Sequence, residues 1–93
     1  MNYAIIALFL LFACSPAAEM CNGMSYQEAQ QIAKAGDCSQ GTLKTTHFCN
    51  EGTNTWWIDL NLEKQGCSPA CVIEVTTKKA EINWRCTGLI PSR

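Results

Sequence analysis

Four side chains in the middle of the chain have the donor types that zinc prefers: His47, Cys49, Cys67 and Cys71. Imidazole nitrogen and thiolate sulfur are the usual ligands of structural zinc, and the Cys-x3-Cys spacing of Cys67 and Cys71 is one that such sites use. A thiol-exchange centre, by contrast, is typically a Cys-x-x-Cys motif at the start of a helix. A metal or thiol-redox site at these four residues is therefore our alternative interpretation.

The sequence gives less support to metal-free catalysis than to a metal site. His47 is the single histidine, and no serine nucleophile motif surrounds it. Carboxylates that could act as an acid–base pair fall on what we expect to be the solvated face of a sheet: Asp59, Glu63, Glu74 and Glu81. There is also no glycine-rich phosphate loop. We therefore expect no enzyme and no cofactor.

The N-terminus has the pattern of an export signal. An apolar run from Tyr3 to Ala13 is too short to cross a bilayer but fits the core of a secretory signal. It ends in Leu11-Phe12-Ala13-Cys14, which resembles a bacterial lipobox. We expect residues 1–13 to be a signal peptide and Cys14 to carry lipid. Two alternatives stay open, namely cleavage after Ala17 or Ala18 and a buried core helix.

Cysteine parity supports export. The chain has 93 residues and seven cysteines, and Cys14 is either lipidated or cut away. An even set then remains, which in a short exported chain indicates three disulfides: Cys21, Cys38, Cys49, Cys67, Cys71 and Cys86. The pairing is open, although a Cys71–Cys86 bridge and a bridge from Cys38 to Cys49 or Cys67 fit the expected strands. We expect a periplasmic or extracellular location, or the outer face of a membrane.

One helix is expected, and it begins at a capping box. Ser25 and Glu28 are three residues apart, so the serine hydroxyl can accept from the Glu28 amide. Ala29, Ile32 and Ala33 then share one narrow face. Gly36 can end the helix because glycine tolerates positive φ. The pattern predicts a helix over residues 26–35, after a tether over residues 14–24.

The residues after Cys38 alternate as strands do. We expect strands over residues 42–50, 56–63, 70–77 and 80–86, separated by short turns. In the second of these, Trp56, Ile58 and Leu60 face one way and Trp57 and Asp59 the other. Trp56 and Trp84 are expected in the core. The fold class is α+β, with an N-terminal helix packed on a four-stranded antiparallel meander within a single domain over residues 25–93.

This order of elements resembles the helix-plus-meander unit of PepSY-type domains. Glu28-Ala29 through Ala33 matches the helix, and Trp57-Ile58-Asp59-Leu60 and Cys71–Ile82 match the later strands. The closing run, residues 80–88, is similar to that of small exported microbial proteins of unknown function. PepSY-type units are associated with inhibiting or chaperoning peptidases, so the resemblance implies an inhibitory role.

One surface stands out as a contact site. Trp57 is expected to point outward beside Asp59 and Arg85, and an aromatic ring among mixed charges is a common protein-contact residue. The alternative is that Trp57 packs over the sheet against Val72 and the Arg85 stem. The formal net charge of −1 argues against a nucleic-acid partner. We therefore expect a module tethered to a membrane by lipid that binds an unknown envelope protein.

Overall fold

The structure, a computed structural model, describes residues 18–87. Its elements follow the order β1 (Met20–Cys21), β2 (Met24–Ser25), α2 (Tyr26–Ala35), a 3-10 turn η1 (Asp37–Gln40), β3 (Thr42–Asn50), β4 (Thr55–Asn61), β5 (Ala70–Glu74) and β6 (Lys79–Asn83). The predicted signal peptide and Cys14 lie outside the described residues.

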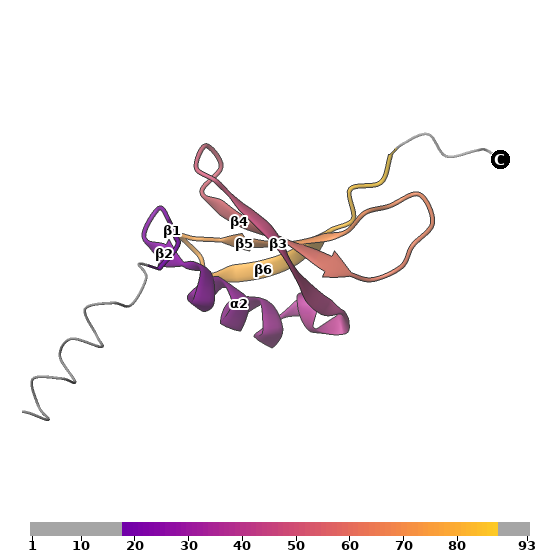
Figure 1. The fold of residues 1–93 in the computed structure, drawn as a ribbon, viewed down its shortest axis with the longest axis horizontal. Coiled ribbons are helices and arrows are strands. Elements are labelled where there is room, and N and C mark those ends of the chain that lie inside the picture. The colour runs from indigo at the N-terminus through magenta and orange to yellow at the C-terminus, as the bar shows by residue number, and fades with distance from the viewer. Residues whose placement is uncertain (1–17, 88–93) are drawn as a thin grey trace, which may run out of the picture.

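The main sheet is an antiparallel meander in the order β3-β4-β5-β6, and α2 packs on one side of it (Figure 1). The α+β class and the four-stranded meander are therefore confirmed. The helix is not the first element, because the two-stranded hairpin β1-β2 precedes it. The chain reverses direction within this hairpin at Asn22 and Gly23, whose φ values of 49° and 97° suit a tight two-residue turn.

The hairpin belongs to the packed domain. Cys21 and Met24 are buried, and the Trp56 indole Nε1 donates a hydrogen bond of 2.9 Å to the Met24 carbonyl. Cys21 and Met24 were expected to form part of a tether, but their side chains lie in the core instead. The packed domain consequently begins before Ser25.

The helix forms where its signals place it. The Ser25 hydroxyl accepts a hydrogen bond of 3.0 Å from the Glu28 amide, and the helix spans Tyr26–Ala35 as predicted. Its end differs in detail, because Gly36 has a φ of −115° rather than a positive value. Ala29 and Ala33 are fully buried, so the narrow small-residue face lets α2 approach the sheet closely.

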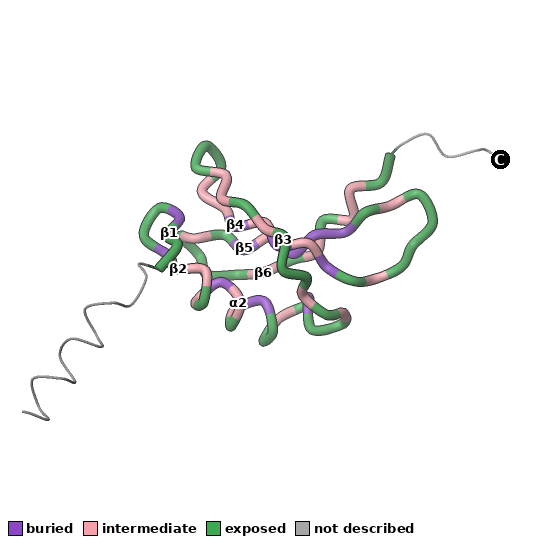
Figure 2. The backbone as a smooth tube through the Cα atoms, in the orientation of Figure 1, coloured by how far each residue is buried: buried purple, intermediate pink, exposed green. Residues whose placement is uncertain are grey.

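The core lies between α2 and the sheet. Alternate residues of β4 and β5 are buried there: Trp56, Ile58, Leu60, Cys71 and Ile73 (Figure 2). Alternation in β4 therefore predicted the two faces of that strand correctly. Trp84 is an exception, because β6 ends at Asn83 and the indole lies outside the core, with the Lys64 ammonium 5.0 Å from its ring centre.

Three disulfides join the elements: Cys21–Cys49, Cys38–Cys71 and Cys67–Cys86. The prediction that six cysteines form three bridges is confirmed, and it fits an oxidising, extracellular compartment. The pairings expected from the strands are wrong. Cys71 faces α2 and η1 and reaches Cys38, while Ile82 rather than Cys86 lies opposite it in β6.

Candidate functional site

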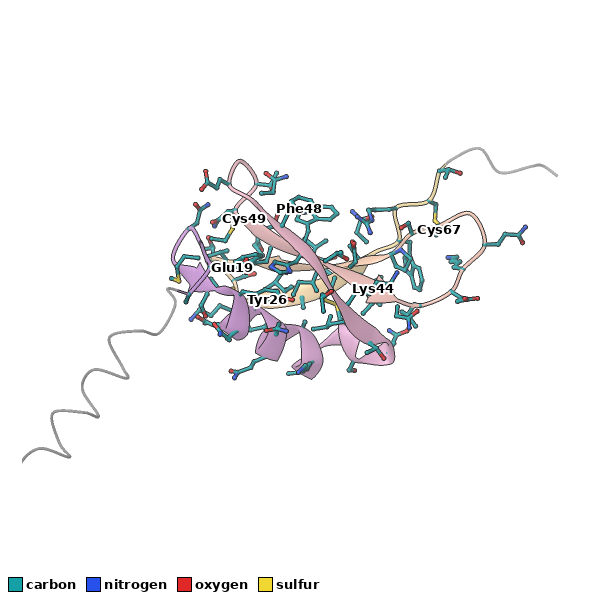
Figure 3. All side chains as sticks on the ribbon, in the orientation of Figure 1. Glu19, Tyr26, Lys44, Phe48, Cys49 and Cys67 are labelled. Atoms are coloured by element: carbon teal, nitrogen blue, oxygen red, sulfur yellow. A yellow bond between two sulfur atoms is a disulfide. The ribbon has the colours of Figure 1, made fainter. Side chains whose placement is uncertain are left out.

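The side of the sheet away from α2 carries a short row of apolar residues. Phe48, Trp57 and Val72 are cross-strand neighbours on β3, β4 and β5, and we call them the aromatic row. Figure 3 shows Phe48 pointing away from α2. The Phe48 and Trp57 rings stack with centroids 5.7 Å apart and planes 14° from parallel. Phe48 is 49% exposed, whereas Trp57 and Val72 are half-buried.

The Trp57 ring is held in place from both sides. Its Nε1 donates a hydrogen bond of 2.8 Å to the Thr55 hydroxyl, and Phe48 covers its other flank. A ring already fixed in this way loses little conformational entropy when a partner covers it. Trp57 was expected either to point outward as a contact residue or to pack over the sheet against Val72. In the structure it lies on the outer face and is the cross-strand neighbour of Val72 there.

A hollow of about 450 Å³ adjoins the aromatic row. Val72 forms part of its lining, together with the charged residues Glu74, Lys79 and Glu81. All three charged residues are exposed. The surface therefore combines an apolar centre with a charged, mainly acidic rim, which is the usual anatomy of a protein-contact patch.

Asp59 and Arg85 lie on the same face but are engaged with each other. Arg85 Nη2 is 2.8 Å from one Asp59 oxygen, and the Thr46 hydroxyl donates to the other at 2.6 Å. The Thr46 hydrogen bond, aided by Arg85, outweighs partial burial and lowers the pKa of Asp59 below its ordinary value. Arg85 also donates to the backbone oxygens of Ser68 and Pro69. The pair therefore secures the β4–β5 loop.

The predicted metal or redox residues are not brought together. Cys49, Cys67 and Cys71 each belong to a different disulfide. Among residues 18–87, no group of three or more His, Cys, Asp or Glu side chains could hold a metal ion. The alternative interpretation therefore loses the ligand cluster on which it depended.

His47 lies on the helix side of β3, at the edge of the core. Its ring stacks on Tyr26 with centroids 3.7 Å apart, its Nε2 is 2.9 Å from Glu19 Oε1, and its Nδ1 is 2.5 Å from the Thr45 carbonyl oxygen. Burial, with a smaller contribution from Glu19, raises the pKa of Tyr26. Both ring nitrogens of His47 thus face protein oxygens. The contacts connect the segment before β1 to the sheet.

Phe48 is the site residue that the sequence analysis missed. Its place follows from register, because His47 lies opposite the buried Ile58 and the next residue must face outward. The polar composition of residues 42–46 hides that alternation, and the register between Leu43 and His47 is shifted. The neighbouring Phe48-Cys49 pair, with one apolar residue on each face, is the signal that could have indicated it.

Comparison with known proteins adds no assignment: no family model, no curated protein and no solved structure matches the chain. In the part of the chain that the structure describes, no helix has the length and apolar character needed to cross a membrane. The surface and its geometry are therefore the basis for a functional proposal.

Proposed function

We propose that this protein is a non-catalytic binding module of the cell envelope, anchored by lipid at Cys14, whose aromatic row contacts a partner protein. The observation that carries the proposal is the stacked Phe48–Trp57 pair. Phe48 keeps 49% of its surface exposed while stacking on a ring that is fixed by its own hydrogen bond. Aromatic anchors of this kind dominate the binding energy of protein interfaces.

The fold favours this face over the others. The opposite side of the sheet is covered by α2, and Phe48 is one of only two large apolar residues in residues 18–87 that are strongly exposed. The other, Met20, lies in the hairpin at the far side of the domain from the β4–β5 loop (Figure 1). An exposed ring on the edge strand β3, continued across β4 and β5 by Trp57 and Val72, supports contact with another protein.

The rim defines the chemistry of the partner. Glu81 lies opposite Val72 in register, and Glu74 is two residues further along β5. We expect the partner to present an apolar side chain to Phe48 and Trp57 and a basic side chain to these carboxylates. The PepSY-like pattern makes an envelope peptidase the first partner to test, with inhibition as the expected effect.

Anchoring and export fit the same proposal. Three disulfides suit an oxidising compartment, and a lipid on Cys14 would hold the domain close to the membrane surface. In the sequence, six residues separate Cys14 from the buried Cys21. The sheet would therefore act within a short distance of the membrane.

The test uses Phe48→Ser in the full-length protein, expressed in the organism from which it comes. Because Phe48 is about half exposed, the fold should survive the change while the contact is lost. Gln31→Ser, at an exposed position of α2, is the matched control. We expect affinity purification to recover a defined partner with the unchanged protein and with the control, but not with Phe48→Ser. Equal recovery with all three proteins would refute the proposed surface.

A further inference from the structure

The Cys67–Cys86 disulfide lies outside the sheet and the core. It joins the β4–β5 loop, residues 62–69, to residues 84–87, and we call these two segments the clasp (Figure 3). Two backbone hydrogen bonds also close the clasp, from the Ser68 amide to the Trp84 carbonyl at 3.0 Å and from the Thr87 amide to the Gly66 carbonyl at 2.9 Å.

The three disulfides differ in the solvent exposure of their cysteines. Cys38 and Cys71 are buried, and Cys21 is buried beside a half-buried Cys49. In the third bridge Cys67 is half-buried and Cys86 is exposed. A thiolate must approach one sulfur atom directly to exchange with a disulfide, so access determines which bridge reacts in the folded protein.

The position of the clasp means that its disulfide can open without unfolding the domain. Neither Cys67 nor Cys86 belongs to the hydrophobic core, whereas Cys21, Cys38 and Cys71 do. Opening either of the other bridges requires the helix, η1 or the hairpin to separate from the sheet. Local openings of peripheral segments occur far more often than openings of the core.

We propose that Cys67–Cys86 is a site of reversible modification by thiols. The thiolate of a small thiol or a dithiol attacks the exposed Cys86 sulfur, forms a mixed disulfide with it and expels Cys67 as a thiolate. A second thiolate then attacks the mixed disulfide and releases Cys86. The two reagent thiols supply two electrons and leave as their own disulfide, and the protein gains two thiols.

The clasp is built so that the disulfide can re-form. Besides the two backbone hydrogen bonds, Arg85 donates to the Ser68 and Pro69 carbonyls and is paired with Asp59 on β4. These contacts do not involve the sulfur atoms, so they persist after reduction and keep the two thiols opposite each other. Asp59 lies two residues from Trp57, so Arg85 joins the clasp to the strand that carries the centre of the aromatic row.

The test is stepwise reduction of the full-length folded protein. Dithiothreitol is added at mildly alkaline pH, samples are quenched with iodoacetamide, and alkylated cysteines are mapped by mass spectrometry. We expect Cys67 and Cys86 to be alkylated at least about tenfold faster than the other four described cysteines, because those require larger openings. Far-ultraviolet circular dichroism should stay unchanged at that stage. First reduction at another bridge, or simultaneous reduction of all three, would overturn the proposal.

A second measurement uses a single free thiol. Cys67→Ser leaves Cys86 unpaired and exposed, and we expect it to take up one glutathione from oxidised glutathione. The matched control Cys38→Ser leaves the buried Cys71 unpaired, and it should react at least about tenfold more slowly while the fold is intact. Equal rates in two folded variants would contradict the proposed access. Should the control unfold, the reduction order of the unchanged protein still decides the matter.

Discussion

Two adjacent tryptophans on opposite faces of β4 give a direct test of the core and the outer surface. Trp56 is 2% exposed, and its Nε1 donates to the Met24 carbonyl, which holds the hairpin to the sheet. Trp57 is half-buried and donates to the Thr55 hydroxyl near the surface. We expect the same substitution, Trp→Phe, to have very different effects at the two positions.

The magnitudes follow from burial. Trp56→Phe removes a buried hydrogen bond and leaves a cavity, so the free energy of unfolding should fall by about 2–4 kcal/mol. Trp57→Phe removes a hydrogen bond near solvent, and we expect a loss of about 0.5–1 kcal/mol. With a urea dependence of about 1 kcal/mol per molar, the unfolding midpoint should fall by about 2–4 M for Trp56→Phe. For Trp57→Phe it should fall by less than about 1 M.

The assay is equilibrium urea unfolding, with the disulfides intact in both variants and in the unchanged protein. Circular dichroism avoids the change in fluorescence that loss of an indole produces. Equal losses at the two positions, or a larger loss for Trp57→Phe, would refute the assignment of faces on which the aromatic row depends.

Three further outcomes are expected. Replacing both Cys38 and Cys71 by Ala should lower the free energy of unfolding by about 3–4 kcal/mol in urea titration, because their bridge closes a loop with a sequence separation of 33. Gly41→Ala should cost about 1–3 kcal/mol by thermal unfolding, since an added Cβ would lie 2.8 Å from a backbone oxygen and 2.6 Å from a leucine carbon. The Asp59 pKa is lower in the folded protein than in the unfolded chain, so this carboxylate stabilises the fold above its unfolded pKa of about 4, and that stability is lost as the pH falls through the lowered value. An acid titration of stability should therefore show a smaller loss for Asp59→Asn than for the unchanged protein, and an identical loss would contradict the Thr46 and Arg85 contacts.

Sequence signals correctly predicted the elements that are determined by contacts between residues close together in the sequence. The Ser25–Glu28 capping box placed the helix, and strict alternation from Trp56 to Leu60 gave the buried face of β4. These signals succeed because hydrogen bonds within a helix turn, and the two faces of a strand, are determined over a few residues.

Features that depend on distant contacts were not predictable in the same way. Asn22-Gly23 is a strong hairpin signal, but the flanking strands have only two residues each and show no periodicity. Six cysteines allow fifteen pairings, and the observed set depends on the tertiary packing that brings Cys38 in η1 to Cys71 in β5. Trp84 continues the alternation of β6, yet the strand stops one residue before it because the clasp begins there.

The most direct test of the account places a photo-reactive phenylalanine analogue at position 48 of the full-length protein in its own cells. The same analogue at the exposed position 31, on α2, is the control. We predict one defined crosslinked partner from position 48, lost when Trp57→Ser is added, and none from position 31. Crosslinking of the same proteins from both positions, or crosslinking at position 48 that is indifferent to Trp57→Ser, would contradict the proposal that the aromatic row is a binding surface.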